Sequence, residues 1–196
     1  MLAYIDTKAN DFSFGYTQRK AVAAALYDVA NDHGKGICTL FENHHDVSAF
    51  AMMRIQFETF VRGAWLLHCA TDNELLTFIE KDKIKSDHHK HFYFGDMVKE
   101  VEAAKDWSGT LSEIKKTGWG ALNSYTHGGQ HQVIRRFDGR TIEPHHEPEQ
   151  IEETVKFSAM ITFLCFCEMI ELTENKEKEK DLYSKELYDQ IHKWMF

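Results

Sequence analysis

The chain has 196 residues, of which 43% are hydrophobic, and its 23 basic and 31 acidic side chains give a formal net charge of −8. An acidic balance of this size argues against a protein that coats nucleic acid through a broad basic face, although it leaves room for a small basic pocket. No segment approaches the run of about eighteen uncharged apolar residues that a membrane span needs, and the N-terminus lacks the order of a secretory signal, so we expect a cytoplasmic protein without membrane contact.

Composition also indicates the fold class. Only two prolines and eleven glycines are present, which favours helices over the turn-rich pattern of an all-β protein. The length supports one sizeable hydrophobic core. We therefore expect a single all-α domain over residues 1–196, with its core at about 16–172 and a charged C-terminal extension at 175–196.

The first two helices are predicted from the spacing of apolar residues. Val22, Leu26 and Val29 recur at helical intervals between about residues 16 and 31, and the sequence Asp-His-Gly at 32–34 is expected to end that helix. The second helix, from about residue 47 to 70, is apolar on nearly every side. A helix of this kind is usually the central one of its bundle.

Three charged residues interrupt that apolar second helix. Arg54, Glu58 and Arg62, here called the arginine stripe, stand at successive i,i+4 positions and so share one face. Charges are seldom buried without partners. The stripe is therefore either a ladder that fixes helix packing or a supply of guanidinium groups for an anionic ligand, because the planar arginine group matches phosphate geometry.

Two shorter helices flank a basic connection. The first is predicted over 72–80 with Asp72 as its N-cap, and the second over 92–105 before a break at the Trp-Ser-Gly sequence. The connection between them, residues 81–91, is basic and should be exposed. Its three histidines could bind zinc, but adjacent histidines on a polar loop rarely form a site without carboxylate or thiolate ligands.

The most informative stretch of the sequence covers residues 118–131, at the end of a helix predicted to start near residue 110. Asn123, Tyr125 and His127 lie close together there and can donate to, accept from and exchange protons with a ligand. Two glycines behind them would let a ligand approach the backbone. The alternative is that these groups cap the helix and satisfy one another.

The same stretch raises the question of a metal. If the helix passes through the glycine pair at 128–129, His127 and His131 share a face at the i,i+4 spacing that suits a metal ion. No acidic residue lies between them as it does in metalloprotease motifs, so we predict no metal site. The alternative is that the helix ends at the glycine pair.

The remaining segments close the predicted core. A tight turn at 138–140 and a loop precede a strongly amphipathic helix that begins after Pro148 and has an acidic first turn, which suits the helix dipole. The extension at 175–196 is dense in charge and ends in an amphipathic turn at 187–196. That turn could cover the bundle or bind a partner.

The order of these segments resembles a known family. A long helix with Arg54, Glu58 and the Arg-Gly-x-Trp sequence at 62–65, followed by the Leu-Asn-Ser-Tyr-Thr-His-Gly sequence at 122–128 and a closing amphipathic helix, is similar to the HEPN superfamily, in particular to an uncharacterised bacterial branch. The resemblance implies a bundle of four to five core helices with short peripheral helices, and a homodimer. Many members are metal-independent ribonucleases of toxin–antitoxin and phage-defence systems. The resemblance therefore also implies an RNA or nucleotide ligand, no cofactor, and a cognate antitoxin or defence partner.

The catalytic motif of that superfamily is only partly present. The motif is an arginine, often followed by asparagine, with a histidine four to six residues after the arginine. Asn123 and His127 stand where the asparagine and the histidine would be, whereas Leu122 stands at the arginine position. The resemblance then implies that His127 moves protons and that Arg54 or Arg62 stabilises the phosphate charge.

Further side chains are assigned to substrate binding from their residue type and their placement on the predicted helices. Asn123 and Tyr125 would orient the phosphate or hold the catalytic histidine. Glu58 and His131 are two further candidates for substrate binding. The arginine pair at 135–136 could also supply a guanidinium, from a second subunit. A two-fold dimer would bring two copies of the site together.

A second function class is a binding module without catalysis. With Leu122 in place of the motif arginine, the bundle could dimerise and bind a protein or a nucleotide. The arginine stripe and His127 would then be interior polar contacts. The direction of these side chains separates the two classes, because catalysis needs His127 and an arginine to meet at a surface that solvent reaches.

A third class is a metal-dependent carboxylate bundle. That class needs Glu-x-x-His pairs on two helices. Glu42 and His45 form one such pair, but Glu168 and Glu171 have no matching histidine. The sequence therefore ranks this class last.

Overall fold

The computed structural model describes residues 15–137, 139–143 and 146–173. In these ranges helices are the only regular secondary structure longer than an isolated β-bridge. They are α2 (Gln18–Glu42), α3 (Asp46–His68), α4 (Asp72–Lys81), α5 (Phe94–Lys105), α6 (Thr110–Thr126), α7 (Gln130–Ile134) and α8 (Pro148–Leu172). The predicted all-α class is confirmed, and none of these described helices combines the length and apolar character that crossing a bilayer requires. The predicted extension at 175–196, with its amphipathic turn, lies outside the described residues.

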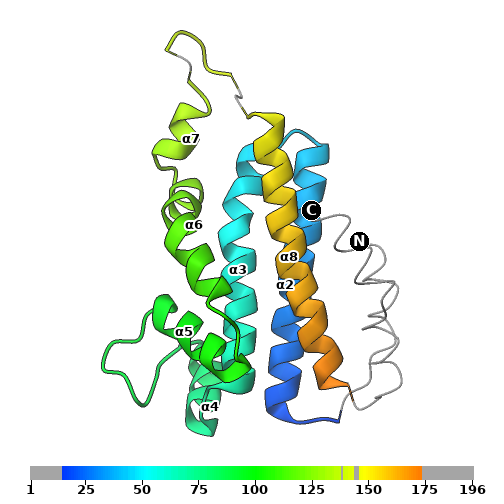
Figure 1. Ribbon diagram of the computed structural model, residues 1–196, viewed down its shortest axis with the longest axis vertical. Helices are drawn as coiled ribbons and strands as arrows, with labels where there is room; N and C mark the ends of the chain where they lie inside the picture. The colour runs from blue at the N-terminus through cyan, green and yellow to red at the C-terminus, as the bar shows by residue number, and fades with distance from the viewer. Residues whose placement is uncertain (1–14, 138, 144–145, 174–196) are drawn as a thin grey trace.

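The long helix α3 lies at the centre of the bundle. It packs against α2 and α8 on one side and against α5 and α6 on the other (Figure 1). The buried residues of these helices form one continuous hydrophobic cluster, which includes Phe57, Phe60 and Leu66 of α3, all fully buried. The prediction that the second helix is central is therefore confirmed, and α4 and α7 are peripheral.

The first described helix is longer than the sequence predicts. The expected stop at residues 32–34 is wrong, because α2 continues through Gly34 to Glu42. A Cβ atom at Gly34 would lie 2.7 Å from Thr162 Oγ1 and 2.8 Å from Gln56 Nε2. The glycine therefore lets α2 approach α3 and α8 closely, and it does not end the helix.

The N-cap of the short helix α4 lies one residue earlier than predicted. Thr71, and not Asp72, is its N-cap: the Thr71 hydroxyl accepts a hydrogen bond from Glu74 N at 3.2 Å, and Glu74 Oε2 accepts one from Thr71 N at 2.7 Å. This reciprocal pair is the capping box that a Thr-x-x-Glu sequence favours. The following connection, residues 81–91, is largely exposed, as predicted.

The way α6 ends determines the position of the polar stretch at residues 118–131. The helix stops at Thr126, and Gly128 then adopts a φ of +67°, a left-handed conformation that glycine tolerates best. Gly129 packs so closely on α6 that a Cβ atom there would lie 2.5 Å from Ser124 Oγ. The chain therefore turns sharply, and α7 begins a separate short helix above α6 (Figure 1).

Candidate functional site

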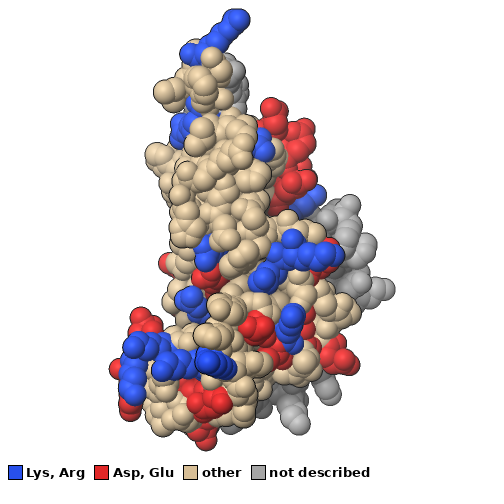
Figure 2. All heavy atoms as spheres, turned by 90° about the vertical axis from the view of Figure 1, so that its left-hand side faces the viewer, with Lys and Arg blue, Asp and Glu red and all other residues tan. Residues whose placement is uncertain are grey.

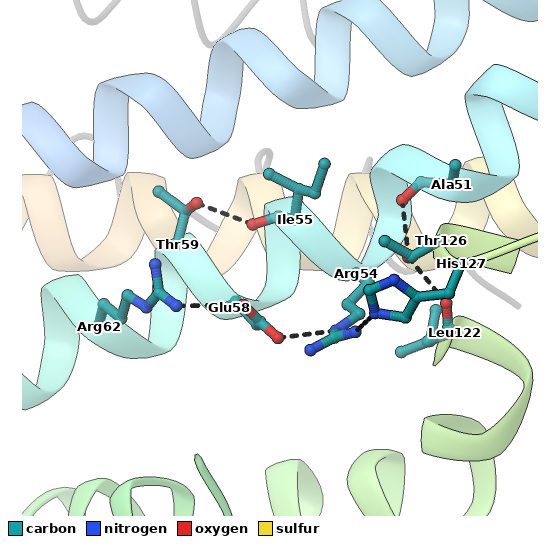
Figure 3. A network of polar contacts seen from close by, with 9 residues as sticks. All are labelled: Ala51, Arg54, Ile55, Glu58, Thr59, Arg62, Leu122, Thr126 and His127. Carbon is teal, nitrogen blue, oxygen red and sulfur yellow. Dashed lines mark hydrogen bonds and ion pairs between the residues drawn. The ribbon is translucent and has the colours of Figure 1, made fainter. Parts of the chain in front are cut away.

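Arg54 and His127 meet where the end of α6 rests on α3. Arg54 Nη1 lies 2.6 Å from His127 Nε2, although the two residues are 73 positions apart (Figure 3). The neighbouring Thr126 fixes this junction, because its hydroxyl lies 2.8 Å from the carbonyl oxygen of Leu122 and 3.3 Å from that of Ala51 on α3. The sequence-predicted acid–base residue and one of its two candidate arginines are thus in contact.

The arginine stripe is paired along α3. Glu58 lies between the two arginines: its Oε1 accepts a hydrogen bond from Arg54 Nε at 2.7 Å, and its Oε2 accepts one from Arg62 Nη2 at 3.2 Å (Figure 3). The side chains of Arg54, Glu58 and Arg62 are 21%, 17% and 45% exposed. The stripe therefore forms the predicted ladder while one edge of it remains open to solvent.

An aromatic ring supports the Arg54 guanidinium. The ring of Trp119 on α6 lies with its centroid 4.9 Å from the central guanidinium carbon of Arg54. Trp119 is itself stacked on Phe94 of α5, with centroids 4.8 Å apart and planes inclined by 15°. A cation over an indole face is attracted by the ring quadrupole. Arg54 is therefore held by Glu58, by His127 and by Trp119 at once.

The chemistry of the Arg54–His127 contact fixes the state of the imidazole. A guanidinium group can only donate hydrogen bonds, so His127 Nε2 must accept the bond and carries no proton in this arrangement. The proton of a neutral ring then lies on Nδ1. His127 is exposed, so an anion that attracts Arg54 would release Nε2 at a surface that solvent reaches.

The other sequence-predicted site residues lie away from this contact. Tyr125 is only 7% exposed, and its ring stacks on Phe50 with centroids 4.9 Å apart. His131 belongs to α7, where its backbone N–H donates to Ser124 Oγ at 2.9 Å. The side chain of Asn123 makes no hydrogen bond with any described residue. Because the helix ends before the glycine pair, the condition for a metal pair of His127 and His131 is not met.

A second polar cluster lies where α2, α3, α5 and α8 meet. Glu168 is 1% exposed, and its carboxylate accepts hydrogen bonds from Tyr27 Oη at 3.1 Å and from His68 Nε2 at 2.6 Å. Lys105 Nζ lies 2.9 Å from Glu168 Oε1 and 2.6 Å from Glu171 Oε2. Neither glutamate is part of a Glu-x-x-His pair in the sequence, but His68 of α3 reaches Glu168 from another helix.

Electrostatics explains how this cluster tolerates burial. Burial alone would raise the pKa of Glu168, but hydrogen bonds from His68 and Lys105 bring it below its ordinary value. Burial and the adjacent Glu168 raise the pKa of Tyr27. The ligand atoms of His68, Glu168 and Glu171 lie within 4.8 Å of one another, a spacing open to a metal ion. The ammonium group of Lys105 already contacts both carboxylates, so the residues as they stand do not fit a metal.

Sequence reasoning missed two partners of the site. Trp119 could not be assigned to the site from the sequence, because a stacking contact between helices leaves no mark in the spacing of one helix. The one available signal was a tryptophan between two glycines, at 118–120, inside a polar stretch. His68 was missed for the same reason, because 100 residues separate it from Glu168.

Comparison with known proteins gives one family. A model described as a family of unknown function, DUF6988, matches residues 27–193. No curated protein matches the chain significantly, and no solved structure does. The matched range contains both the arginine stripe and His127. Since this match covers most of the sequence, the chain belongs to the family of unknown function DUF6988.

Proposed function

We propose that the protein is a metal-independent ribonuclease whose active site is the pair of Arg54 and His127. The observation that carries the proposal is the 2.6 Å contact between the guanidinium and the imidazole at an exposed end of α6. The resemblance of residues 122–128 to the HEPN motif supports the same reaction. Leu122 packs in the core, and Arg54 supplies from α3 the guanidinium that the motif would take from α6.

The proposed reaction is attack of an RNA 2′-oxygen on the adjacent phosphorus. The 2′-hydroxyl loses its proton, the bond from phosphorus to the 5′-oxygen breaks, and that oxygen gains a proton, so a 2′,3′-cyclic phosphate and a 5′-hydroxyl result. His127, with Nε2 unprotonated, takes the first proton. Arg54 turns towards the phosphate and stabilises its developing negative charge. Arg62 lies further along α3, on the other side of Glu58, and adds a second positive charge.

A homodimer belongs to this proposal, because two proton transfers are served best by two histidines. Support comes from the segment called the arm, residues 133–137 and 139–143, which begins with the last two residues of α7 and lies at the top of the molecule (Figure 1). The arm carries four large apolar side chains that are at least half exposed, namely Val133, Ile134, Phe137 and Ile142. Exposed apolar groups gathered on one projection favour contact with another chain.

The proposed setting is the bacterial cytoplasm, in a toxin or phage-defence system with a cognate antitoxin or defence partner. A ribonuclease of this kind would slow growth when it is produced alone. Induction of the wild-type protein and of His127→Ala in the same host is the corresponding test. This setting is supported if the wild-type protein arrests growth and the variant does not. Equal growth of the two cultures counts against it.

The direct test of the ribonuclease proposal is cleavage of a short RNA by purified protein in the presence of a metal chelator. His127→Ala should lower kcat by about 10²–10⁴-fold, the range that general acid–base catalysis spans. His45→Ala is the matched control, because His45 is an exposed histidine whose side chain does not cap α3. Cleavage at the wild-type rate by His127→Ala would remove the proposal.

The second candidate is a binding module without catalysis. The observation in its favour is that Glu58 and His127 already use the Nε and Nη1 donors of Arg54. Under this function the wild-type protein binds a nucleotide or a protein partner through the same surface and leaves RNA intact. Binding without cleavage, retained in His127→Ala, would decide for this candidate.

A further inference from the structure

Charge is distributed unevenly along the chain. Residues 81–143 carry eight lysines and three arginines against nine acidic residues, whereas the whole chain has eight more acidic than basic side chains. These residues form α5, α6, α7 and the segments next to them, which make up one side of the molecule (Figure 1). That side is therefore weakly basic in a protein that is acidic overall.

Four of the nine acidic residues on this side accept hydrogen bonds from groups within the protein. Asp87 accepts hydrogen bonds from Asn73 Nδ2, and Asp96 accepts one from the backbone N–H of Tyr93 at 3.0 Å. Glu100 accepts from the indole N–H of Trp65 at 2.6 Å. Glu102, which is 7% exposed, accepts from the backbone N–H of Ser112 at 2.9 Å. Carboxylates bonded in this way offer less negative charge to a ligand in solution.

Several basic residues on the same side have no such partner. Lys83, Lys85 and Lys90 are exposed in the connection at 81–91, and none of them forms a hydrogen bond or ion pair with a described residue. In the arm, Arg136 is exposed and Arg135 is half-buried, and the side chain of neither arginine forms a hydrogen bond or ion pair with a described residue. Figure 2 shows Lys and Arg gathered at the lower end of this face, over the connection, and again near its top, over the arm.

An uncharged strip separates the two basic groups. Residues 117–134 contain no Asp, Glu, Lys or Arg, and Figure 2 shows a surface with little charge over the upper part of this face. The strip covers the last ten residues of α6, about 15 Å, whereas the first part of α6 carries Glu113, Lys115 and Lys116. His127 lies at the upper end of α6. At the lower end the ring of Tyr93 is 68% exposed beside the basic connection.

We infer that this face binds single-stranded RNA along α6, with its phosphates held by Lys83, Lys85 and Lys90 at one end and by Arg135 and Arg136 at the other. This inference rests on the proposed function, and it names the substrate class and the surface that would bring a phosphate to Arg54. Exposed aromatic rings and unpaired cations are the groups that bind single strands, through base stacking and phosphate contacts. Residues 117–134, at the end of α6 and in α7, place no negative charge against the strand, and Lys115 and Lys116 outnumber Glu113 in the first part of α6.

The chemistry of the site selects a single strand over a duplex. Attack by the 2′-oxygen requires that oxygen to lie opposite the leaving 5′-oxygen. A flexible single strand reaches this arrangement, whereas an A-form duplex holds its backbone in a fixed helical shape. Two small basic groups with a neutral gap also suit one backbone better than the two backbones of a duplex.

The test is RNA binding by the full chain in the His127→Ala background, measured by fluorescence anisotropy with a labelled single strand at several salt concentrations. The connection variant is Lys83→Glu with Lys85→Glu, and the arm variant is Arg135→Glu with Arg136→Glu. The control is Lys20→Glu with Lys156→Glu, which makes the same change in net charge on α2 and α8. Circular dichroism melting confirms that all four proteins fold.

Each test variant should weaken binding at least about tenfold and reduce the slope of log Kd against log salt by about 1.4, since each single-strand phosphate contact contributes about 0.7. The control should bind like the parent protein. Equal weakening by the control, no weakening by either test variant, or tighter binding of a duplex of the same sequence would overturn the inference. An arm variant that changes the mass of the particle in light scattering and leaves RNA binding unchanged would also overturn it, because the arm would then serve only as a contact between copies.

The two proposals fail separately. If the variants weaken RNA binding but the wild-type protein never cuts RNA, the binding surface stands and the ribonuclease proposal falls. If the wild-type protein cuts RNA and neither test variant binds RNA more weakly than its His127→Ala parent, the ribonuclease proposal stands and the binding surface falls.

Discussion

Arg54 Nη1 lies 2.6 Å from His127 Nε2, and Glu58 holds the opposite edge of the same guanidinium group. The guanidinium therefore stands between a carboxylate that neutralises it and an imidazole that only accepts from it. A phosphate would compete with Glu58 for Arg54. The strength of this competition is open to measurement.

Removal of the Glu58 charge should strengthen anion binding. In Glu58→Gln the neutral amide holds Arg54 and Arg62 less firmly, so both become available to a phosphate group. We expect RNA to bind a few times more tightly in the His127→Ala background, and the free energy of unfolding to fall by only about 0.5–1 kcal/mol, because the pair is partly exposed. Weaker RNA binding would contradict this role for Glu58. Glu152→Gln, which removes an exposed i,i+4 partner of Lys156 on α8, is the matched control.

His146 should make the fold sensitive to mild acid. Its ring stacks on Phe50 with centroids 4.8 Å apart, and both of its ring nitrogens are buried without a hydrogen-bond partner among the described residues. Burial lowers the pKa of His146, so the unfolded chain takes up the proton at a higher pH than the folded protein does. The stability of the wild-type protein should therefore fall as the pH drops below about 6.5, the ordinary value for histidine.

The measurement is urea unfolding of the wild-type protein and of His146→Phe between about pH 7 and pH 5. The variant should become more stable relative to the wild-type protein as the pH falls, because phenylalanine has no proton to take up. His88→Phe, at an exposed histidine, should show no such trend. A constant difference between His146→Phe and the wild-type protein across this range would show that His146 is not linked to folding.

The buried cluster around Glu168 should be the most sensitive ionic feature of the fold. Glu168→Gln leaves His68, Lys105 and the Tyr27 hydroxyl without their carboxylate, and we expect a loss of about 3–5 kcal/mol in the free energy of unfolding at neutral pH. Glu171→Gln should cost less than about 1 kcal/mol, because Glu171 is 42% exposed. Urea unfolding of the two variants gives the comparison, and equal losses would argue against a special role for Glu168.

The cluster around Glu168 should also make the stability of the fold depend on pH, in a more acidic range than the one in which His146 acts. The pKa of Glu168 is lowered in the folded state, so its contribution is fully present above about pH 4.3, the ordinary value for glutamate, and is lost as the pH falls through the folded value. The wild-type protein should therefore lose stability in this lower range, whereas Glu168→Gln should not show this part of the loss.

Helix positions could be predicted well because apolar periodicity is a local property. The centre and the ends of α3, and the start of α8 after Pro148, followed from the spacing of apolar residues. The stop predicted at Gly34 failed because a glycine can serve either a turn or a close helix contact. Only the position of α8 across from Gly34 decides between the two.

The candidate site could be predicted only in part. Residue types indicated His127 and the arginine stripe, but their contact depends on how α6 lies on α3. Tyr125 belongs to the same polar stretch, yet its position on α6 turns it towards Phe50 in the core. Partners from different helices, such as Trp119 and His68, leave no pattern that one sequence could reveal.

Two glycines test this account of helix packing. Gly34→Ala should destabilise the protein by about 1–3 kcal/mol, because the added methyl group meets Thr162 and Gln56 between packed helices. Gly118→Ala should stabilise it by about 0.5–1 kcal/mol, because a Cβ atom there has open space and alanine favours a helix interior. Thermal and urea unfolding give both values, and a neutral Gly34→Ala would mean that α2 and α8 pack less closely.

The most direct measurement of the central claim compares a short RNA with the same oligonucleotide built from 2′-deoxy nucleotides, each incubated with the purified protein and a metal chelator. Attack by the 2′-oxygen, assisted by His127 and Arg54, predicts that only the RNA is cut and that mass spectrometry finds 2′,3′-cyclic phosphate ends. Equal cleavage of the deoxy strand, or RNA fragments that end in a 3′-hydroxyl group, would contradict it.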